Sequence, residues 1–413
     1  MSYVIYKATI FSNRPDITQM NILYIGLFRF PEGDAAASRV LNNARMFRDL
    51  GHYVKILSFG GEYREEDASV EGYVYDGMQY EITHDIDTHS WKERILRYTY
   101  PNPNARTYII KYIDYYDVII TYNTTCPMNL FLQRICKTHK KKIVLDITEW
   151  PAPNEIPGGR LSPIFWLSEL NMRYVQKRFK NLIPISHYLD NYYAKSNNLL
   201  LPPLINMYDS KWNVFKTTKM VELTEFDGIR LIFAGTPAKK DLLGNLIEAL
   251  IQVLSYTSKI QLVVAGVSNK QAKQYCNEKA LTEFKSNFVF LGRVPQSFVP
   301  SLYHISDFST IIREPSRKNN AGFPTKMAES MAAGCPVFLN CTSDLGDYAI
   351  DGLNAIYIES YHVDSIRKGL FRILSIPKDQ ILKMKQTARQ TGEQKFDYHK
   401  YMKKGEDFFK KLM

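Results

Sequence analysis

The sequence has little of three features that would set its class at once. Its 413 residues include only five cysteines, an odd number without metal-ligand spacing: Cys126, Cys136, Cys276, Cys335 and Cys341. No apolar run reaches the roughly 18–20 residues that a membrane-spanning helix needs. The start of the chain lacks the charged, apolar and small regions of a signal peptide. We therefore expect a protein of a reducing compartment, the cytoplasm, without structural zinc.

Acidic residues are in the minority, since 53 Lys and Arg stand against 42 Asp and Glu and give a formal net charge of +11. Such an excess favours anionic partners, whether nucleotide phosphates, a phospholipid surface or nucleic acid. The sequence shows no zinc finger, RNA-binding strand motif or basic heptad repeat. We therefore expect no nucleic-acid partner, and the basic runs 137–142 and 173–180 fit solvated helix faces.

What the sequence does contain is two series of alternating strands and helices. A hydrophobic content of 45% and a charged content of 23% are typical of a globular protein. A chain of this length is expected to form two domains of about 200 residues each. The stiff pair Pro202-Pro203 marks the linker between them. The expected division is an extension at 1–19, a first domain at 20–203, a second domain at 204–390 and a final helix at 391–413.

The first series opens with a strand from Asn21, a loop with Pro and Gly, a helix that ends at Gly51, and a strand at Val54–Phe59. This order predicts a right-handed βαβ unit, whose loop lies at the carboxyl edge of the sheet, where open α/β sheets bind ligands. Gly33 in this loop allows close approach to the backbone, and Arg39 is expected to reach the same crevice. The alternatives are a turn glycine and a surface arginine.

A second unit joins the short apolar runs 117–122 and 142–147 through a helix. Asp146 is near the end of the later strand, and Glu149 and Trp150 follow it, so we expect all three at the same edge. The alternative for Glu149 is a solvated acid at a strand end. The region 72–116 is irregular, and aromatic and basic residues alternate in it: Trp91, Lys92, Arg94, Arg97, Tyr98 and Tyr100. They predict either a helix packed on the sheet or a patch that rests on anionic lipid.

The second series begins at Arg230 with the strand RLIFAG, followed by the loop TPAKK and a helix. Its strands are nearly continuous in apolar residues, as expected of a parallel sheet covered on both faces. The loop places Gly235 and the cations Lys239 and Lys240 at a carboxyl edge, so these lysines are candidates for binding phosphate. The chain ends in a helix with one apolar and one basic face.

Residues 313–337 are the most informative stretch. A helix over 326–333 is expected behind Pro324, with Thr325 as its cap, and Gly334 is expected to end it in a left-handed conformation. Strands are expected before it at Phe308–Ile312 and after it at 336–340. A helix N-terminus behind a glycine-containing loop suits a diphosphate, Lys326 adds a cation, and Glu329 can accept hydrogen bonds from sugar hydroxyls. The alternative is an ordinary capped helix of an α/β sheet.

Four strings together resemble a known family: NILYIGLFRFPEGDAAASR, LIFAGTPAKKDLLGNLIEAL, FLGRV and GFPTKMAESMAAGCPV. They are similar to the retaining GT-B nucleotide-sugar glycosyltransferases of family four, over about residues 20–413. The resemblance implies an α/β fold of two Rossmann-like domains that face an interdomain cleft, with a C-terminal helix that crosses back to the first domain. It also implies that the second domain holds the nucleotide sugar and the first holds the acceptor.

The resemblance also implies site residues. The family has two glutamates separated by seven residues. Glu329 matches the second, which binds the ribose, whereas Ala321 stands at the first, and Glu314 could replace it only if Ser316–Asn320 loops out. The catalytic residues are expected to be Lys240, Lys326, Glu329 and Glu149. The donor site is expected to comprise Gly33, Gly235, Thr236, Lys240, Arg293, Gly322, Phe323, Pro324, Thr325, Lys326 and Glu329, and the acceptor side Arg39, Asp146, Glu149 and Trp150.

The expected reaction is metal-independent transfer of a sugar, with retention, from a nucleoside diphosphate to a hydroxyl of a saccharide or lipid-linked acceptor in surface polysaccharide or glycolipid synthesis. No cofactor is expected, because the nucleotide sugar is a substrate, and no Asp-x-Asp metal motif follows a predicted strand. Membrane contact would be peripheral. Two alternatives remain: a nucleotide-sugar 2-epimerase of the same fold, and a non-catalytic subunit that binds a nucleotide sugar. Turnover without an acceptor would distinguish the first, and binding without transfer the second.

Overall fold

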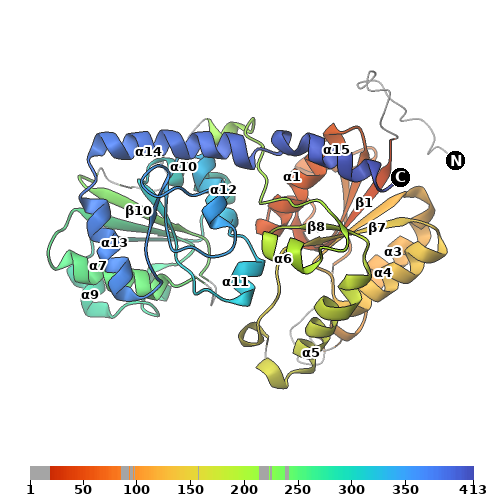
Figure 1. The fold of residues 1–413 in the computed structure, drawn as a ribbon, viewed down its shortest axis with the longest axis horizontal. Helices are drawn as coiled ribbons and strands as arrows, with labels where there is room; N and C mark the ends of the chain where they lie inside the picture. The colour runs from red at the N-terminus through yellow and green to blue at the C-terminus, as the bar shows by residue number, and fades with distance from the viewer. Residues whose placement is uncertain are drawn as a thin grey trace.

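The protein is described here by a computed structural model that covers residues 19–84, 93, 96, 98–156, 158–213, 223, 226–237 and 241–413. Its described strands form two separate sheets, one from each half of the chain, and helices cover both (Figure 1). This is the α/β architecture of two parallel-sheet domains that the sequence predicted. None of the described helices is both long enough and apolar enough to cross a membrane.

The first sheet has the order β3-β4-β5-β2-β1-β6-β7-β8-β9. Strands β5, β2, β1, β6, β7, β8 and β9 run parallel, and Ile22 of β1 lies opposite Val54 of β2 and Val118 of β6. Apart from Leu27, the apolar residues of β1 are buried, because helices cover both faces of this sheet. The strands are β1 (Asn21–Phe30), β2 (Tyr53–Gly61), β3 (Ala68–Ser69), β4 (Gly72–Tyr75), β5 (Met78–Ile82), β6 (Val118–Tyr122), β7 (Lys142–Ile147), β8 (Asn181–Pro184) and β9 (Asn197–Asn198).

The helices of this half confirm both predicted βαβ units. They are α1 (Ala35–Asp49), α3 (Pro103–Tyr112), α4 (Cys126–Thr138), α5 (Pro163–Leu170) and α6 (His187–Tyr192). Asp34 caps α1 by accepting a hydrogen bond from the Ala37 amide at 2.7 Å. The interpretation of 72–116 as irregular was wrong, since β4 and β5 form an antiparallel hairpin there and α3 follows. Trp91, Lys92, Arg94 and Arg97 of the expected lipid patch lie outside the described residues.

The second sheet is parallel and has the order β12-β11-β10-β13-β14-β15. Its strands are β10 (Ile229–Ala234), β11 (Ile260–Ala265), β12 (Phe288–Gly292), β13 (Phe308–Ile311), β14 (Val337–Leu339) and β15 (Ala355–Tyr357). The helices are α7 (Leu243–Leu254), α8 (Asn269–Ala272), α9 (Glu278–Glu283), α10 (Val299–His304), α11 (Arg317–Ala321), α12 (Thr325–Ala332), α13 (Val363–Leu374) and α14 (Lys378–Thr391). The stretch between β11 and β12 contains two short helices, α8 and α9.

The chain passes between the halves twice, and the two crossing segments are hydrogen-bonded to each other. The Ile205 amide donates to the Phe396 carbonyl, and the Tyr398 amide donates to the Ile205 carbonyl, both at 2.9 Å. Beyond this point the last helix, α15 (Met402–Lys410), lies against α1 of the first half (Figure 1). Its Phe409 ring is 5.1 Å from the Phe47 ring. The end of the chain therefore belongs to the core of the first half.

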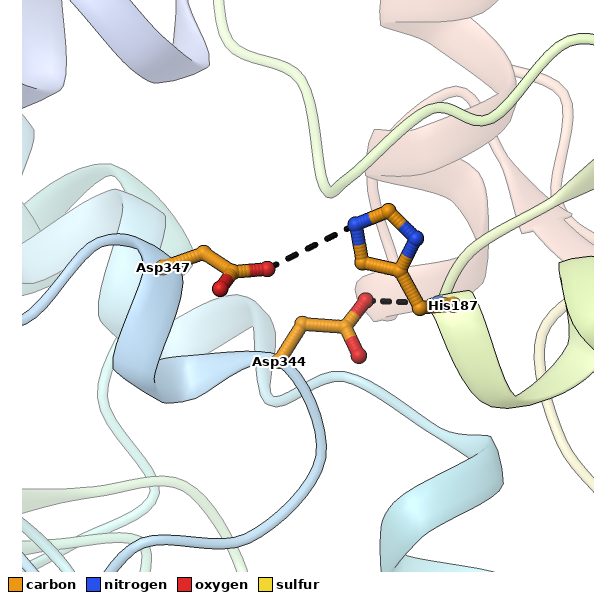
Figure 2. Close-up of side chains that lie close together, drawn as sticks. All are labelled: His187, Asp344 and Asp347. Carbon is orange, nitrogen blue, oxygen red and sulfur yellow. Dashed lines mark hydrogen bonds and ion pairs between the residues drawn. The ribbon is translucent and has the colours of Figure 1, made fainter.

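Polar contacts join the two halves directly. The Ser186 hydroxyl donates to the Ala321 carbonyl at 2.7 Å, and the His187 amide donates to Asp344 Oδ2 at 2.7 Å. The His187 ring also pairs with the carboxylate of Asp347, at 3.5 Å. Figure 2 shows both contacts of His187. These contacts place the loops that follow β8, β13 and β14 next to one another, so the carboxyl edges of the two sheets face the same boundary.

Candidate functional site

The carboxyl end of β10 is an exposed, glycine-containing edge. Gly235 and Thr236 directly follow the strand, and both are exposed. Gly235 has φ of +114°, a conformation that side chains rarely adopt. A β-carbon there would lie 3.4 Å from Cε of Lys326. Gly235 and Lys326 therefore lie next to each other, as expected, although they are 91 positions apart in the sequence.

Lys326 is held over this edge by its neighbours. Its Nζ lies 3.5 Å from Asp241 Oδ2 and 3.9 Å from the centre of the Phe233 ring. Asp241 also accepts a hydrogen bond from Arg313 at 3.1 Å. Asp241 therefore orients two cations, and the ammonium of Lys326 is directed along the edge instead of extending into solvent. No role for Asp241 or Arg313 was predicted, because their pairing joins residues 72 positions apart in the sequence.

The backbone amides at the start of α12 are the second part of this edge. The helix runs over Thr325–Ala332 with Pro324 at its N-cap, and no described side chain caps it. The prediction that Thr325 is the cap was wrong, because Thr325 is the first helical residue. Gly334 ends the helix with φ of +72°, as predicted. The first amides of α12 thus keep the partial positive charge that favours an anion.

Glu329 lies one turn into α12 and is half-buried. Burial raises the pKa of its carboxyl, and the nearby cations Lys211 and Lys326 oppose this rise. A carboxylate that is incompletely solvated and close to Lys326 is well suited to accept hydrogen bonds from hydroxyl groups of a ligand. This position agrees with the role that the family resemblance implies.

The segment before α12 differs from expectation. Ser316–Asn320 does not loop out, because Arg317–Ala321 forms the short helix α11 with Ser316 at its N-cap. Glu314 is exposed at the start of this segment, so it does not take the place of a carboxylate at Ala321, which is buried. The sequence missed α11, although Ser316 is a typical N-cap residue.

Gly322 and Phe323 contribute to packing. A β-carbon on Gly322 would lie 3.4 Å from the Thr148 carbonyl of the first half, so this glycine permits close contact between the halves. The Phe323 ring packs 5.3 Å from the Tyr348 ring and is buried. The Gly322 amide donates to the Lys318 carbonyl at 3.0 Å, and the Gly322 carbonyl accepts a hydrogen bond from the Ser343 hydroxyl. The Phe323 side chain is part of the core.

Two of the acceptor-side predictions were wrong. Arg39 and Asp146 form an ion pair at 2.8 Å, and their side chains are 2% and 0% exposed. Arg39 also donates to the Leu201 carbonyl at 2.9 Å, and Asp146 accepts a hydrogen bond from the Tyr24 hydroxyl. The pair lies in the core of the first half, beneath α1, and does not reach a binding surface. Because a buried charge requires a partner, each residue stabilises the other.

Trp150 is also buried, with its indole Nε1 donating to Glu169 Oε1 at 2.8 Å. The guanidinium of Arg317 from α11 lies 4.6 Å from the centre of its ring. Trp150 therefore serves the contact between the halves and is not an exposed platform for an acceptor. Trp150 lies at the carboxyl edge of the sheet, as predicted. The prediction that it contacts an acceptor was wrong, because its side chain is buried.

Glu149 is exposed and lines a pocket of about 180 Å³ in the first half. Asn123 and Thr125 from the loop after β6 line the same pocket, together with Tyr98. Asn123 has φ of +44° and donates to the Thr148 hydroxyl, which links the loops after β6 and β7. The sequence did not single out Asn123 or Thr125, although both directly follow a predicted strand and share the edge with Glu149.

Three further residues were predicted to bind the sugar donor, and their positions in the structure differ. Lys240, with Lys239, lies outside the described residues. Arg293 is exposed after β12, at the same edge of the sheet as Gly235. Gly33 is exposed in the loop after β1, where a β-carbon would lie 2.6 Å from Cβ of Arg29, so the loop itself requires glycine.

Comparison with known proteins agrees with this geometry. Residues 216–391 match the family model of glycosyl transferases group 1. No curated protein matches the chain. The structure of HepE from Anabaena in complex with UDP and glucose is 14% identical, with a TM-score of 0.68, 95% of this chain covered and 100% of that one.

Two other solved structures show the same fold. Sucrose-phosphate synthase from Thermosynechococcus elongatus is 14% identical, with a TM-score of 0.69 and coverage of 95% of this chain and 99% of that one. WaaG, a glycosyltransferase involved in lipopolysaccharide biosynthesis, is 15% identical, with a TM-score of 0.66 and coverage of 93% and 98%. Residues 216–391 thus match the model of glycosyl transferases group 1, and the chain shares the two-domain GT-B fold of these solved structures.

Proposed function

We propose that the protein transfers a sugar, with retention and without a metal, from a nucleoside diphosphate to a hydroxyl of a saccharide or lipid-linked acceptor. The setting would be surface polysaccharide or glycolipid synthesis, on the cytoplasmic side of a membrane. The donor would bind to the second half of the chain and the acceptor to the first. The observation that carries the proposal is the meeting of Gly235, Lys326 and the start of α12 at one exposed edge.

This edge suits a diphosphate for a physical reason. The Gly235 backbone leaves room for a ligand beside Lys326, and the amides of Thr325 and Lys326 point out of the helix start. Asp241 keeps Lys326 in place before a ligand arrives. Lys240 would add a second cation from the loop after β10. When the sugar–phosphate bond breaks, these groups would stabilise the negative charge on the leaving diphosphate.

The acceptor hydroxyl would approach from the pocket that Glu149 and Asn123 line. In transfer with retention, the hydroxyl attacks the anomeric carbon on the face that the diphosphate leaves, and its proton passes to the leaving phosphate oxygen. Glu149 would orient the hydroxyl by accepting its hydrogen bond. Glu329 would hold the ribose hydroxyls of the donor. Contact between the two halves would exclude water and limit hydrolysis of the donor.

A thermal-shift panel of UDP-, GDP- and ADP-sugars tests the donor assignment. A ligand present at 100 times its dissociation constant should raise the free energy of unfolding by about 2.7 kcal/mol. We expect one nucleotide to stabilise the wild type clearly and a Lys240→Ala variant much less. No shift with any of the donors would contradict the proposal.

A second assay separates transfer from the alternatives of an epimerase and a binding subunit. The nucleotide released from the stabilising donor is measured with and without a mixture of acceptors. Release that depends on the acceptor supports transfer. A changed donor sugar without any acceptor would indicate a 2-epimerase, and binding without turnover under all conditions would indicate a non-catalytic subunit.

A further inference from the structure

We propose that the acceptor is an amphiphile, a phosphate joined to an apolar chain, and that a cavity between the two halves receives the phosphate while the exposed face of α5 receives the chain. This inference rests on the proposed function and names its acceptor class. It depends on two independent features: a basic cavity at the domain boundary and an apolar helix face that continues from it.

The cavity has a volume of about 580 Å³ and lies between α5 and α11. Four cationic side chains line it, two from each half of the chain: Arg160, Arg173, Arg317 and Lys318. Only Glu169 lines it with the opposite charge, and Glu155, which binds Lys318, lies beside it. Four cations against two carboxylates leave an excess of two positive charges, so the cavity favours an anion.

The four cations differ in the ion pairs that they form with the rest of the protein. Arg173 and Arg317 share Glu169 at 2.7 Å each, so one carboxylate serves two guanidinium groups. Arg160 forms no ion pair with any part of the chain that the structure describes. Lys318 is nearly buried, and burial lowers the pKa of its amine while the charge of Glu149 opposes this shift.

Apart from Ser316, the rest of the cavity lining is apolar and consists of Ala152, Pro153, Phe165 and Trp166. A free inorganic anion would leave these walls in contact with water, whereas an amphiphile would cover them. Because removing apolar area from water is favourable, the chain of such a ligand would stabilise the complex.

The face of α5 extends this apolar surface out of the cavity. Trp166, Leu170 and Tyr174 recur every four residues through α5 and the helical turns after it, and they are 61%, 45% and 63% exposed. This spacing places them along one side of the helix. Leu161, just before α5, is 94% exposed. The helix lies at one end of the domain boundary, with α11 across from it (Figure 1).

Basic side chains lie beside this apolar face. Arg173, Lys177, Arg178 and Lys180 lie on the same helical segment or just after it and are exposed. Aromatic and aliphatic residues beside cations are typical of a helix that rests on an anionic lipid surface. A lipid-linked phosphate would satisfy both features at once, because its chain and its charge are covalently joined.

The test uses dodecyl phosphate as the probe, with inorganic phosphate and dodecyl maltoside as controls, and measures binding to the full-length protein by calorimetry. We expect dodecyl phosphate to bind at least tenfold more tightly than either control. An Arg160→Glu variant should weaken this binding at least tenfold, and a Leu170→Ser/Tyr174→Ser variant should remove the advantage over inorganic phosphate. A Tyr256→Ser variant, which changes a 76% exposed tyrosine of α7's following turn, should bind like the wild type.

Other outcomes would overturn the inference. Equal binding of inorganic and dodecyl phosphate would indicate a soluble anionic acceptor, and equal binding of dodecyl maltoside would indicate a surface for neutral detergent. Binding unaffected by Arg160→Glu would place the phosphate elsewhere. The wild type and all variants are then assayed for nucleotide-sugar binding by thermal shift. If the wild type binds a nucleotide sugar but not dodecyl phosphate, only the proposed acceptor class is wrong. If the wild type binds no nucleotide sugar, the proposed function itself is contradicted.

Discussion

Arg317 of the second half places its guanidinium 4.6 Å from the ring centre of Trp150 in the first half, and it also donates to Glu169, to which the Trp150 indole is bound. One arginine thus holds a buried tryptophan and its carboxylate partner across the domain boundary. Because Arg317 is in α11, directly before the proposed donor site, the same contact connects the position of that site to the relative placement of the two halves.

Replacing Arg317 with alanine should loosen this boundary. The cation–π contact and the partly exposed ion pair together are worth about 1–2 kcal/mol. We expect a lower melting temperature and a larger radius of gyration in X-ray scattering, with secondary structure retained. Arg367→Ala is the matched control, because its ion pair with Asp364 lies within α13. An unchanged radius of gyration in Arg317→Ala would argue against a role for this contact in holding the halves together.

Replacing Lys326 with methionine should abolish most of the activity and leave the fold intact. Methionine keeps the apolar stem over Phe233 and removes the charge that the leaving diphosphate requires. One electrostatic group of this kind contributes on the order of 3–4 kcal/mol to the transition state, so we expect kcat to fall at least a hundredfold. The measurement is acceptor-dependent release of nucleotide. Lys383→Met, at an exposed position of α14, should retain wild-type activity.

Replacing Glu329 with glutamine should weaken donor binding and raise stability. Burial raises the pKa of Glu329, so the ionised side chain costs stability above its folded-state pKa. The variant should therefore melt at a higher temperature than the wild type near pH 8. This difference should shrink as the pH falls through the folded-state pKa toward 4.5, where the wild-type carboxyl becomes neutral. Glu283→Gln, an exposed change in α9, should show no such pH-dependent difference.

His52 should make the docking of the last helix sensitive to acid. Its ring is buried 4.5 Å from that of Phe409, and burial lowers its pKa to about 4. A depressed pKa means that His52 stabilises the fold fully above its unfolded pKa of about 6.5 and that this contribution is lost as the pH falls to 4. The loss would amount to about 3 kcal/mol.

Unfolding in denaturant at pH 7 and pH 4.5 tests this expectation. The wild type should lose more stability between these values than His52→Gln does. His362→Gln, which changes an exposed histidine of the second half, should behave like the wild type. If His52→Gln and the wild type lose the same stability on acidification, another group carries the acid response.

Removing bound metal tests the prediction of a metal-independent reaction, which relied in part on the absence of an Asp-x-Asp motif after a predicted strand. The hairpin strand β5 ends at Ile82, three residues before Asp85-Ile86-Asp87, whose structure lies outside the described residues. An Asp-x-Asp sequence therefore does follow a strand, although the sequence interpretation saw none there. We still expect full transfer activity after treatment with EDTA and in an Asp87→Asn variant. Activity that is lost with EDTA and restored by Mn²⁺ would contradict the metal-independent mechanism.

Much of the fold was predictable because its signals are local. The strand β1, the stop at Gly51 and the left-handed Gly334 each depend on a few neighbouring residues. The hairpin of β4 and β5 has a local signal as well, the pair Asp76-Gly77, which is typical of a tight hairpin turn. Both residues have positive φ in the structure, as such a turn requires.

The candidate site was less predictable because its contacts are long-range. Arg39 and Asp146 are 107 positions apart, and nothing local shows that the two charges neutralise each other in the core. Asp241 and Lys326 are likewise joined only by the fold. The sequence therefore identified which side chains lie at carboxyl edges, but it could not say which of them the protein uses to stabilise itself.

The position of α15 has a consequence for how the protein is made. Phe408, Phe409 and Leu412 complete the same core as Ile22 and Tyr24 of β1, so this core can close only after α15 has been translated. Until those residues leave the ribosome, the nascent first half exposes the apolar side of α1. A chaperone that binds during synthesis would therefore have the longest time to act on this half, and a stop codon before α15 would leave the core of the first half incomplete.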